Sequence, residues 1–214
     1  MVETLARKAF ETFSAVHLLF NNAGVGPGKT ACTIEDWEWI LGVNLWGVIH
    51  GIHFFVPRML DQGSECHIVN TASMAGLISG PGQSIYKVSK HGVVTLSETL
   101  YHDLALWGAN IKVSVLCPGV VNTNILDAQR HRPVRLQNTT DEKNVSPQSE
   151  AMQHRIQQVF REGMTPLHVA DILFETIREE QFYILTHPEL KFAVKSRMDD
   201  ILQERNPTQS RASQ

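Results

Sequence analysis

The sequence predicts an α/β fold, a doubly wound parallel sheet with helices packed on both faces. Short apolar runs of strand length alternate with longer segments of helical spacing, and no internal repeat or linker interrupts this alternation along 214 residues. The composition agrees, because 43% hydrophobic and 19% charged residues are typical of one globular domain with a buried core.

Each element follows from a local pattern. Apolar residues at helical spacing predict helices over residues 2–14, 33–61, 84–107 and 165–177. Thr33, followed by Asp36, forms the capping pattern of the second helix. Apolar runs ended by glycine, proline or polar residues predict strands over 17–22, 66–70, 111–117 and 182–185. The domain thus covers residues 1–206, with an aperiodic polar loop at 127–149 and a polar tail at 207–214.

Composition and charge exclude several classes of function. A net charge of −3 and a pI near 6.4 provide no basic field, so neither nucleic acid nor an anionic membrane is expected as a partner. The odd set Cys32, Cys66 and Cys117 lacks metal-ligand spacing and predicts buried thiols in a reducing compartment. Because no secretory signal follows Met1, we expect a cytoplasmic protein. The ten histidines lack the clustering of a metal site, so no metal is expected.

Residues 39–57 raise the alternative of a membrane helix. This stretch has no Asp, Glu, Lys or Arg and contains Gly47-x-x-x-Gly51, a spacing found where membrane helices pair. Asn44, His50, His53 and three glycines lower its hydrophobicity, and it is barely long enough to span a bilayer. The pattern favours an apolar helix in a soluble core.

The loop after the first strand contains two incomplete nucleotide motifs. Residues 23–30 nearly match a phosphate-binding loop with Lys29, but the next helix cap lies at Thr33, beyond the point where such a loop enters its helix. Gly26-x-Gly28-x-x-Ala31 resembles a dinucleotide fingerprint, yet residues 46–51 lack the required acid. We interpret the segment as a glycine-rich loop bordering a site, and a phosphate-loop hydrolase as the weaker alternative.

Tyr86 and Lys90 carry the clearest chemical signal. Their i, i+4 spacing places the phenol and the ammonium on one face of the helix that begins near residue 84. A free phenol has a pKa of about 10 and is a poor base at neutral pH unless a nearby positive charge favours the phenolate. Lys90 can supply that charge. By itself the pair is common, and its weight depends on the residues around it.

Further motifs stand at the expected carboxyl edge of the sheet. They are Asn21-Asn22-Ala23-Gly24 after the first strand, Asn44 in the next helix, Ser73 after the second strand, and Pro118-Gly119 with Thr123 after the third. Together with Tyr86-x-x-x-Lys90 this set resembles the short-chain dehydrogenase/reductase family over residues 1 to about 206. The resemblance implies a Rossmann-like fold and an oxidoreductase that moves a hydride between NAD or NADP and an alcohol or carbonyl substrate.

The resemblance also implies roles for single residues. Tyr86 is expected to be the general acid/base, and Ser73 to hydrogen-bond the reacting oxygen. Lys90 is expected to hold the nicotinamide ribose and to lower the phenol pKa, and Asn44 to anchor a water molecule that links Lys90 to solvent. The cofactor-binding residues implied are Asn21, Ala23, Gly24, Tyr86, Lys90, Pro118, Gly119, Val121 and Thr123, with Asn22 joining the strands of the sheet.

The sequence departs from the family's pattern at its beginning. It opens after the glycine-rich turn and the second strand of such folds, so the first strand-helix-strand-helix-strand half, on the order of 60 to 80 residues, is expected to be missing. The remaining sheet would have four strands, with the 17–22 strand as an exposed edge. A truncated, inactive chain that serves as a folding or oligomer partner is therefore an alternative.

Two properties remain as expectations. Apolar residues on more than one stripe of the helices 33–61 and 84–107 predict a homodimer or homotetramer through these helices. A flexible segment at about 124–164 is expected to decide the substrate, which its residues do not identify.

Overall fold

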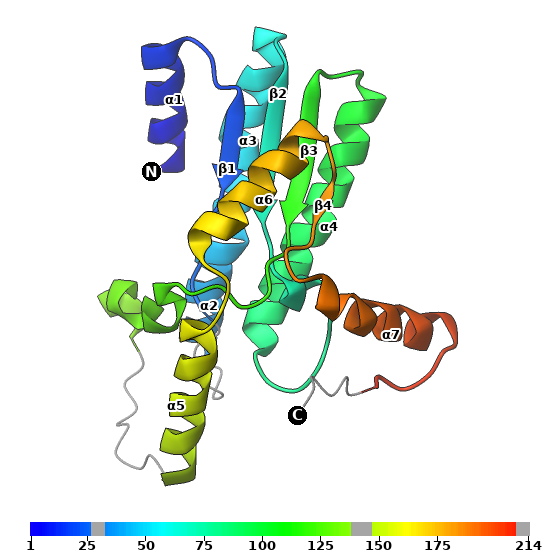
Figure 1. Ribbon diagram of the computed structural model, residues 1–214. Coiled ribbons are helices and arrows are strands. Elements are labelled where there is room, and N and C mark those ends of the chain that lie inside the picture. The colour runs from blue at the N-terminus through cyan, green and yellow to red at the C-terminus, as the bar shows by residue number, and fades with distance from the viewer. Residues whose placement is uncertain (27–32, 138–146, 209–214) are drawn as a thin grey trace.

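The computed structural model describes residues 1–26, 33–137 and 147–208, with the side chains of 147–150 left aside (Figure 1). Its centre is a parallel sheet of four strands in the order β1-β2-β3-β4. The strands are β1 (Leu18–Asn21), β2 (Cys66–Thr71), β3 (Ile111–Leu116) and β4 (Tyr183–Ile184). The predicted fold class is confirmed, and in the described part of the chain β1 is an edge strand, as expected.

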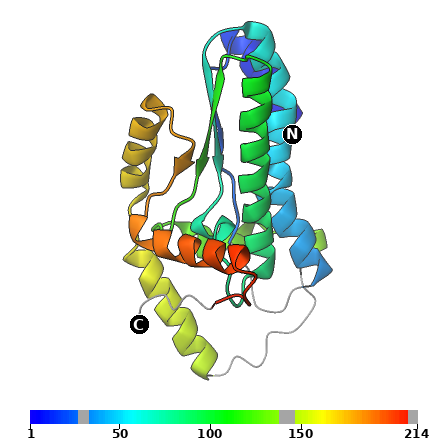
Figure 2. The same ribbon diagram turned by 90° about the vertical axis from the view of Figure 1, so that its right-hand side faces the viewer.

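Helices cover both faces of the sheet, as Figure 2 shows with α3 and α4 on one side and α6 on the other. The helices are α1 (Val2–Phe13), α2 (Ile34–Asn44), α3 (Trp46–Gln62), α4 (Ser84–Leu106), α5 (Pro147–Arg161), α6 (Pro166–Arg178) and α7 (Lys191–Leu202). Such coverage buries parallel strands on both faces, and the β2 side chains from Cys66 to Asn70 are all buried.

The helix predicted over 33–61 is divided at Leu45. Thr33 caps it as expected, because its hydroxyl accepts from the Asp36 N–H while the Asp36 carboxylate accepts from the Thr33 N–H. The hydrogen bonds continue from Leu45 N–H to Leu41 and from Ile49 N–H to Leu45, but φ at Leu45 widens to −108°. The kink follows Asn44, whose side chain is fixed by contacts outside the helix.

Among the described residues, Ile34–Gln62 is the one helical stretch whose length and mean hydropathy of 1.5 would suffice to cross a membrane. Its α3 half contributes Val48, Gly51, Phe55, Val56 and Met59 to the buried interior. These side chains pack on the sheet, which is the behaviour of a core helix.

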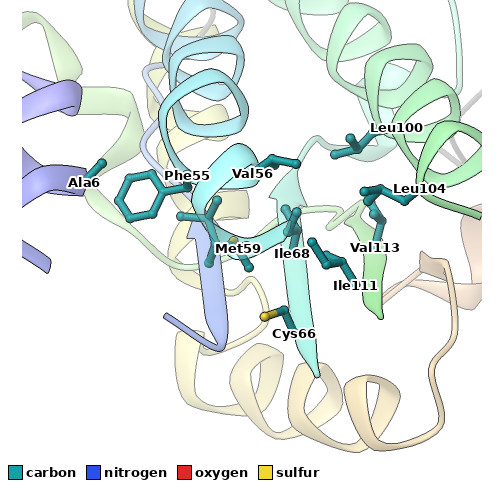
Figure 3. Packing of buried hydrophobic residues seen from close by; sticks show 11 residues of the cluster. Ala6, Phe55, Val56, Met59, Cys66, Ile68, Leu100, Leu104, Ile111 and Val113 are labelled. Carbon is teal, nitrogen blue, oxygen red and sulfur yellow. The ribbon is translucent and has the colours of Figure 1, made fainter. Parts of the chain in front are cut away.

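Figure 3 shows the main core at the amino ends of the strands. Phe55 and Met59 of α3 and Leu104 of α4 pack against Ile68 of β2 and neighbouring strand residues. Two of the predicted buried thiols, Cys66 and Cys117, are buried and free, whereas Cys32 lies outside the described residues. Further buried clusters extend toward the carboxyl ends of the strands, with Val115 and Cys117 in one and Leu116 and Ile184 in another.

The stretch predicted as an aperiodic loop, 127–149, contains regular structure. Two 3₁₀ segments, η2 (Asn124–His131) and η3 (Val134–Leu136), follow β3, and α5 begins at Pro147. Hydrophobic periodicity did not predict these 3₁₀ turns, because contacts with residues distant in sequence stabilise them. One such contact is the buried ion pair of Arg132 and Asp36. In both views α5 extends away from the sheet (Figures 1 and 2).

Candidate functional site

The predicted site residues meet where the parallel strands end. Ser73 follows β2 and caps the short 3₁₀ turn η1 (Met74–Gly76) by accepting from the Ala75 N–H at 3.1 Å. Pro118 follows β3, and its carbonyl accepts from the Met74 N–H at 2.9 Å and from the Ser73 hydroxyl at 3.3 Å. Tyr86 stands in the first turn of α4, opposite these turns.

The hydroxyl of Ser73 lies close enough to the Tyr86 phenol to influence its pKa. Burial raises the pKa of Tyr86, because a phenolate loses hydration there, and the Ser73 contact lowers it by a smaller amount. The sequence predicted a lowered phenol pKa through Lys90, and this is wrong for the protein described here. The Lys90 Nζ lies 5.7 Å from the ring centroid, and burial of the phenol is the largest influence on its pKa.

Lys90 is 3% exposed, and burial lowers its pKa to about 8. Its Nζ donates to the Thr71 carbonyl at 2.9 Å, the last residue of β2. A methyl group at Gly24 would lie 3.6 Å from this Nζ, so the loop after β1 runs past the ammonium. Gly76 permits close packing from the other side, because a methyl there would lie 2.6 Å from the Lys90 carbonyl.

Asn44 is fully buried and joins three parts of the site. Its Oδ1 accepts from the Val25 N–H at 2.8 Å, and its Nδ2 donates to the Val25 carbonyl at 3.1 Å and to the Ser89 hydroxyl at 3.2 Å. Ser89 donates to the Tyr86 carbonyl at 2.7 Å. The side chain therefore links the loop after β1 to the second turn of α4. Its role in a water path stays a prediction.

The residues of the Asn21 to Gly24 motif have two kinds of environment: the two asparagines connect strands, and the last two residues lie at the carboxyl edge of the sheet. Asn21 donates to Asn70 Oδ1 at 2.8 Å on the side facing α3, so its side chain joins β1 to β2. Asn22 accepts from the Thr71 hydroxyl at 3.0 Å and also joins these strands, as expected. Ala23 and Gly24 are exposed at the edge.

The segment after Gly119 is paired with the residue pair before α6 through a single parallel β-bridge. Val121 pairs with Met164, and the Asn122 N–H donates to the Met164 carbonyl at 2.9 Å. Val121 is half-buried, and Thr123 is exposed immediately before η2. Both thus lie along the same edge as Pro118.

Sequence reasoning missed His187, which follows β4. Its Nδ1 accepts from the Gly119 N–H at 3.0 Å. The signal that could have found it is its place after the last strand, since parallel strands end at one edge.

The motifs for other chemistry gain no support. Gly28 and Lys29 of the phosphate-loop alternative lie in residues 27–32, outside the described residues. Among the described residues, no group of three His, Cys, Asp or Glu side chains is arranged to hold a metal ion.

Comparison with known proteins gives a consistent family. The family described as short chain dehydrogenase matches residues 1–133. A CLA biosynthesis dehydrogenase/reductase of Lactiplantibacillus plantarum is 33% identical over 208 residues, covering 96% of this chain and 73% of that protein. A C alpha-dehydrogenase of a Sphingobium species is 33% identical over 215 residues, covering 97% and 68%.

Solved structures agree with these sequences. A short-chain dehydrogenase/reductase from Burkholderia phymatum in complex with NAD has a TM-score of 0.91 and 47% identity, covering 99% of this chain and 75% of that one. A putative short-chain dehydrogenase from Novosphingobium aromaticivorans has a TM-score of 0.71 and 29% identity, covering 99% and 66%.

Proposed function

The chain belongs to the short-chain dehydrogenase family, and from this membership we propose which of its residues carry the reaction. It is an oxidoreductase that transfers a hydride between NAD or NADP and an alcohol or carbonyl substrate. The relatives favour neither a phosphate-loop hydrolase nor an inactive partner chain. The observation that supports our assignment is that the Ser73 hydroxyl influences the pKa of the buried Tyr86 phenol, one helical turn from a buried Lys90.

Tyr86 exchanges a proton with the substrate oxygen. A bound nicotinamide would supply or accept the hydride. Because the pKa of Tyr86 is raised, the phenol is protonated at neutral pH and ready to donate to the oxygen of a carbonyl. Alcohol oxidation needs the phenolate and is favoured as pH rises. Ser73 holds the same oxygen within reach of the phenol.

The residues around Lys90 fit a nicotinamide nucleotide. Of the three ammonium protons, one goes to the Thr71 carbonyl, and among the described residues no second acceptor is within hydrogen-bond distance. A buried ammonium needs such partners, and two ribose hydroxyls would provide them. The exposed Ala23 and Gly24 lie beside it on one side. Pro118, Gly119, Val121 and Thr123 form the other side, where we place the nicotinamide amide.

The side chain of Asn21 contributes indirectly. It is occupied by Asn70 and packed against α3, so we assign it to the support of the edge that carries Ala23 and Gly24. The segment 124–164, with α5, is our candidate for substrate selection, since it follows the proposed nicotinamide contacts directly.

We also propose a homo-oligomer through α3 and α4. Between these helices lies an apolar hollow of about 350 Å³, lined by Ile52, Val56, Leu96 and Trp107 among others. Trp107 is 60% exposed and Leu106 83%, which is costly for large apolar side chains unless a partner covers them. A soluble, cytoplasmic protein without membrane or nucleic-acid partners remains our expectation, in line with its net charge of −3. Sedimentation at several concentrations measures the assembly.

The test of the assignment is Tyr86→Phe. Loss of the general acid/base should lower turnover by about 10² to 10⁴-fold, while NAD or NADP binding measured by calorimetry persists. Turnover is followed by NAD(P)H absorbance with a panel of secondary alcohols and ketones. Tyr101→Phe, an exposed tyrosine on the same helix, is the matched control and should leave turnover unchanged. Full activity in Tyr86→Phe would remove Tyr86 from the mechanism.

A further inference from the structure

The segments that follow β3 and β4 leave the sheet side by side. The two strands are parallel, and the Cys117 N–H donates to the Ile184 carbonyl at 2.9 Å just beyond the paired residues. Gly119 and His187 are therefore neighbours at the carboxyl edge, although 68 residues separate them in sequence. Figure 1 shows β3 and β4 adjacent at this point.

His187 makes a specific contact with Gly119. Its Nδ1 accepts from the Gly119 N–H at 3.0 Å, and the Thr186 hydroxyl lies 2.7 Å from the same nitrogen. Because a backbone N–H donates to Nδ1, this nitrogen carries a lone pair and the proton of the neutral ring is on Nε2. The ring lies against the Gly119 α-carbon, since a methyl there would be 2.6 Å from the His187 Cγ. A side chain at position 119 would displace the imidazole.

The Gly119 N–H and the Pro118 carbonyl belong to one planar peptide group. His187 binds this group at its N–H, and the Ser73 hydroxyl donates to its carbonyl at 3.3 Å. Rotation of the peptide would break both contacts together. A hydrogen bond to the N–H also polarises the carbonyl and strengthens it as an acceptor. The direction of this carbonyl therefore helps to fix the position of the Ser73 Oγ.

We propose that His187 is a positioning residue for the reaction: it fixes the Pro118–Gly119 peptide, which in turn holds the Ser73 side chain in place beside Tyr86. This inference rests on the proposed roles of Ser73 and Tyr86. His187 acts without touching the substrate, through a continuous set of contacts from Nδ1 to the peptide, to Ser73 and to the phenol.

Two variants of similar shape isolate the contact. In His187→Asn the amide oxygen occupies nearly the place of Nδ1 and can still accept from the Gly119 N–H, whereas His187→Leu places a methyl group there. We expect about a tenfold lower kcat in His187→Leu, the size of one lost hydrogen bond expressed only in catalysis, and near-normal kcat in His187→Asn.

The pH profile separates positioning from general damage. Because the Ser73 contact lowers the pKa of Tyr86, Ser73→Ala should move the profile of alcohol oxidation to higher pH. His187→Leu, which loosens the Ser73 side chain, should move it in the same direction, while His187→Asn should not. Lys90 and Cys117, the other titratable groups beside the site, are unchanged in all these variants. His187→Asn removes the same imidazole as His187→Leu, so a shift caused by the loss of the ring itself would appear in both. In the Ser73→Ala background, His187→Leu should have little further effect, since both act through one hydroxyl.

The outcomes are distinct in the intact protein. Equal activity in wild type, His187→Leu and His187→Asn, an equal loss in both variants, or independent effects of His187→Leu and Ser73→Ala would each overturn the inference. If His187→Leu does not fold by circular dichroism, His187→Asn decides: an unchanged profile supports the inference and a shifted one overturns it. Full turnover in Tyr86→Phe would refute the proposed function itself, independently of the His187 variants.

Discussion

The buried ion pair between Asp36 and Arg132 fastens the segment after β3 to the start of α2, so removal of the Asp36 carboxylate should strongly destabilise the protein. Arg132 Nη1 lies 2.6 Å from Asp36 Oδ1, and the two side chains are only 3% and 7% exposed. The guanidinium also lies over the Trp39 ring, 5.1 Å from its centroid. Asp36 further accepts from the Thr33 N–H as part of the helix cap.

The magnitude follows from the burial of both charges. Removing one partner of a buried pair leaves the other charge poorly solvated and costs about 3–5 kcal/mol. In a chain of this length each kcal/mol lowers Tm by about 2–4 °C, so Asp36→Ala should lower Tm by about 6–20 °C. The pair of Arg135 and Glu38 joins the same two segments at 2.5 Å, but its side chains are 70% and 52% exposed. Glu38→Ala should therefore cost less than about 1 kcal/mol.

Urea unfolding followed by circular dichroism measures both variants. Asp36→Asn keeps an oxygen for the cap while removing the charge, and should retain most of the loss seen in Asp36→Ala if the ion pair dominates. The exposed pair should weaken further at high salt, and the buried pair should not. A cost in Asp36→Ala no larger than that in Glu38→Ala would refute this reasoning.

Two further predictions concern the site and its support. Because the pKa of Lys90 falls from 10.5 to about 8 on folding, the unfolded chain binds more protons between these values, and Lys90 contributes an increase in unfolding free energy as pH rises through that window. Urea unfolding at several pH values should show this rise as a difference in unfolding free energy between wild type and Lys90→Met. The comparison cancels the opposite contribution of Cys117, whose pKa is raised to about 12, because both proteins contain Cys117. A difference that does not change with pH would contradict the prediction. On α3, Gly51→Ala would overlap the Asn21 side chain and should cost about 1–3 kcal/mol. Gly47 lies in open space on the same helix, so Gly47→Ala should stabilise the protein by up to about 1 kcal/mol. Equal unfolding midpoints of Gly51→Ala and Gly47→Ala would show that the overlap with Asn21 is relieved without cost.

Local patterns predicted most of the elements. The helix cap at Thr33, the four strands and the long helix carrying Tyr86 and Lys90 follow from signals within a few residues, and each is present. The predicted loop at 127–149 was wrong in part because its 3₁₀ turns depend on Asp36, which is distant in sequence. The kink at Leu45 was missed for a similar reason, since Asn44 is fixed by Val25 and Ser89.

The candidate site likewise has features that follow from local sequence and features that depend on tertiary contacts. The sequence by itself determined which chemical groups are present and that Ser73, Tyr86 and Lys90 meet at the carboxyl edge, because i, i+4 spacing on a helix and strand ends in a parallel sheet are geometric consequences of local structure. Only the tertiary structure decided their electrostatics. Burial depends on what packs around a group, and so the pKa of Tyr86 is raised where the local pair predicted a lowered value. The contact of His187 with Gly119 likewise exists only because β3 and β4 are adjacent strands of the folded sheet.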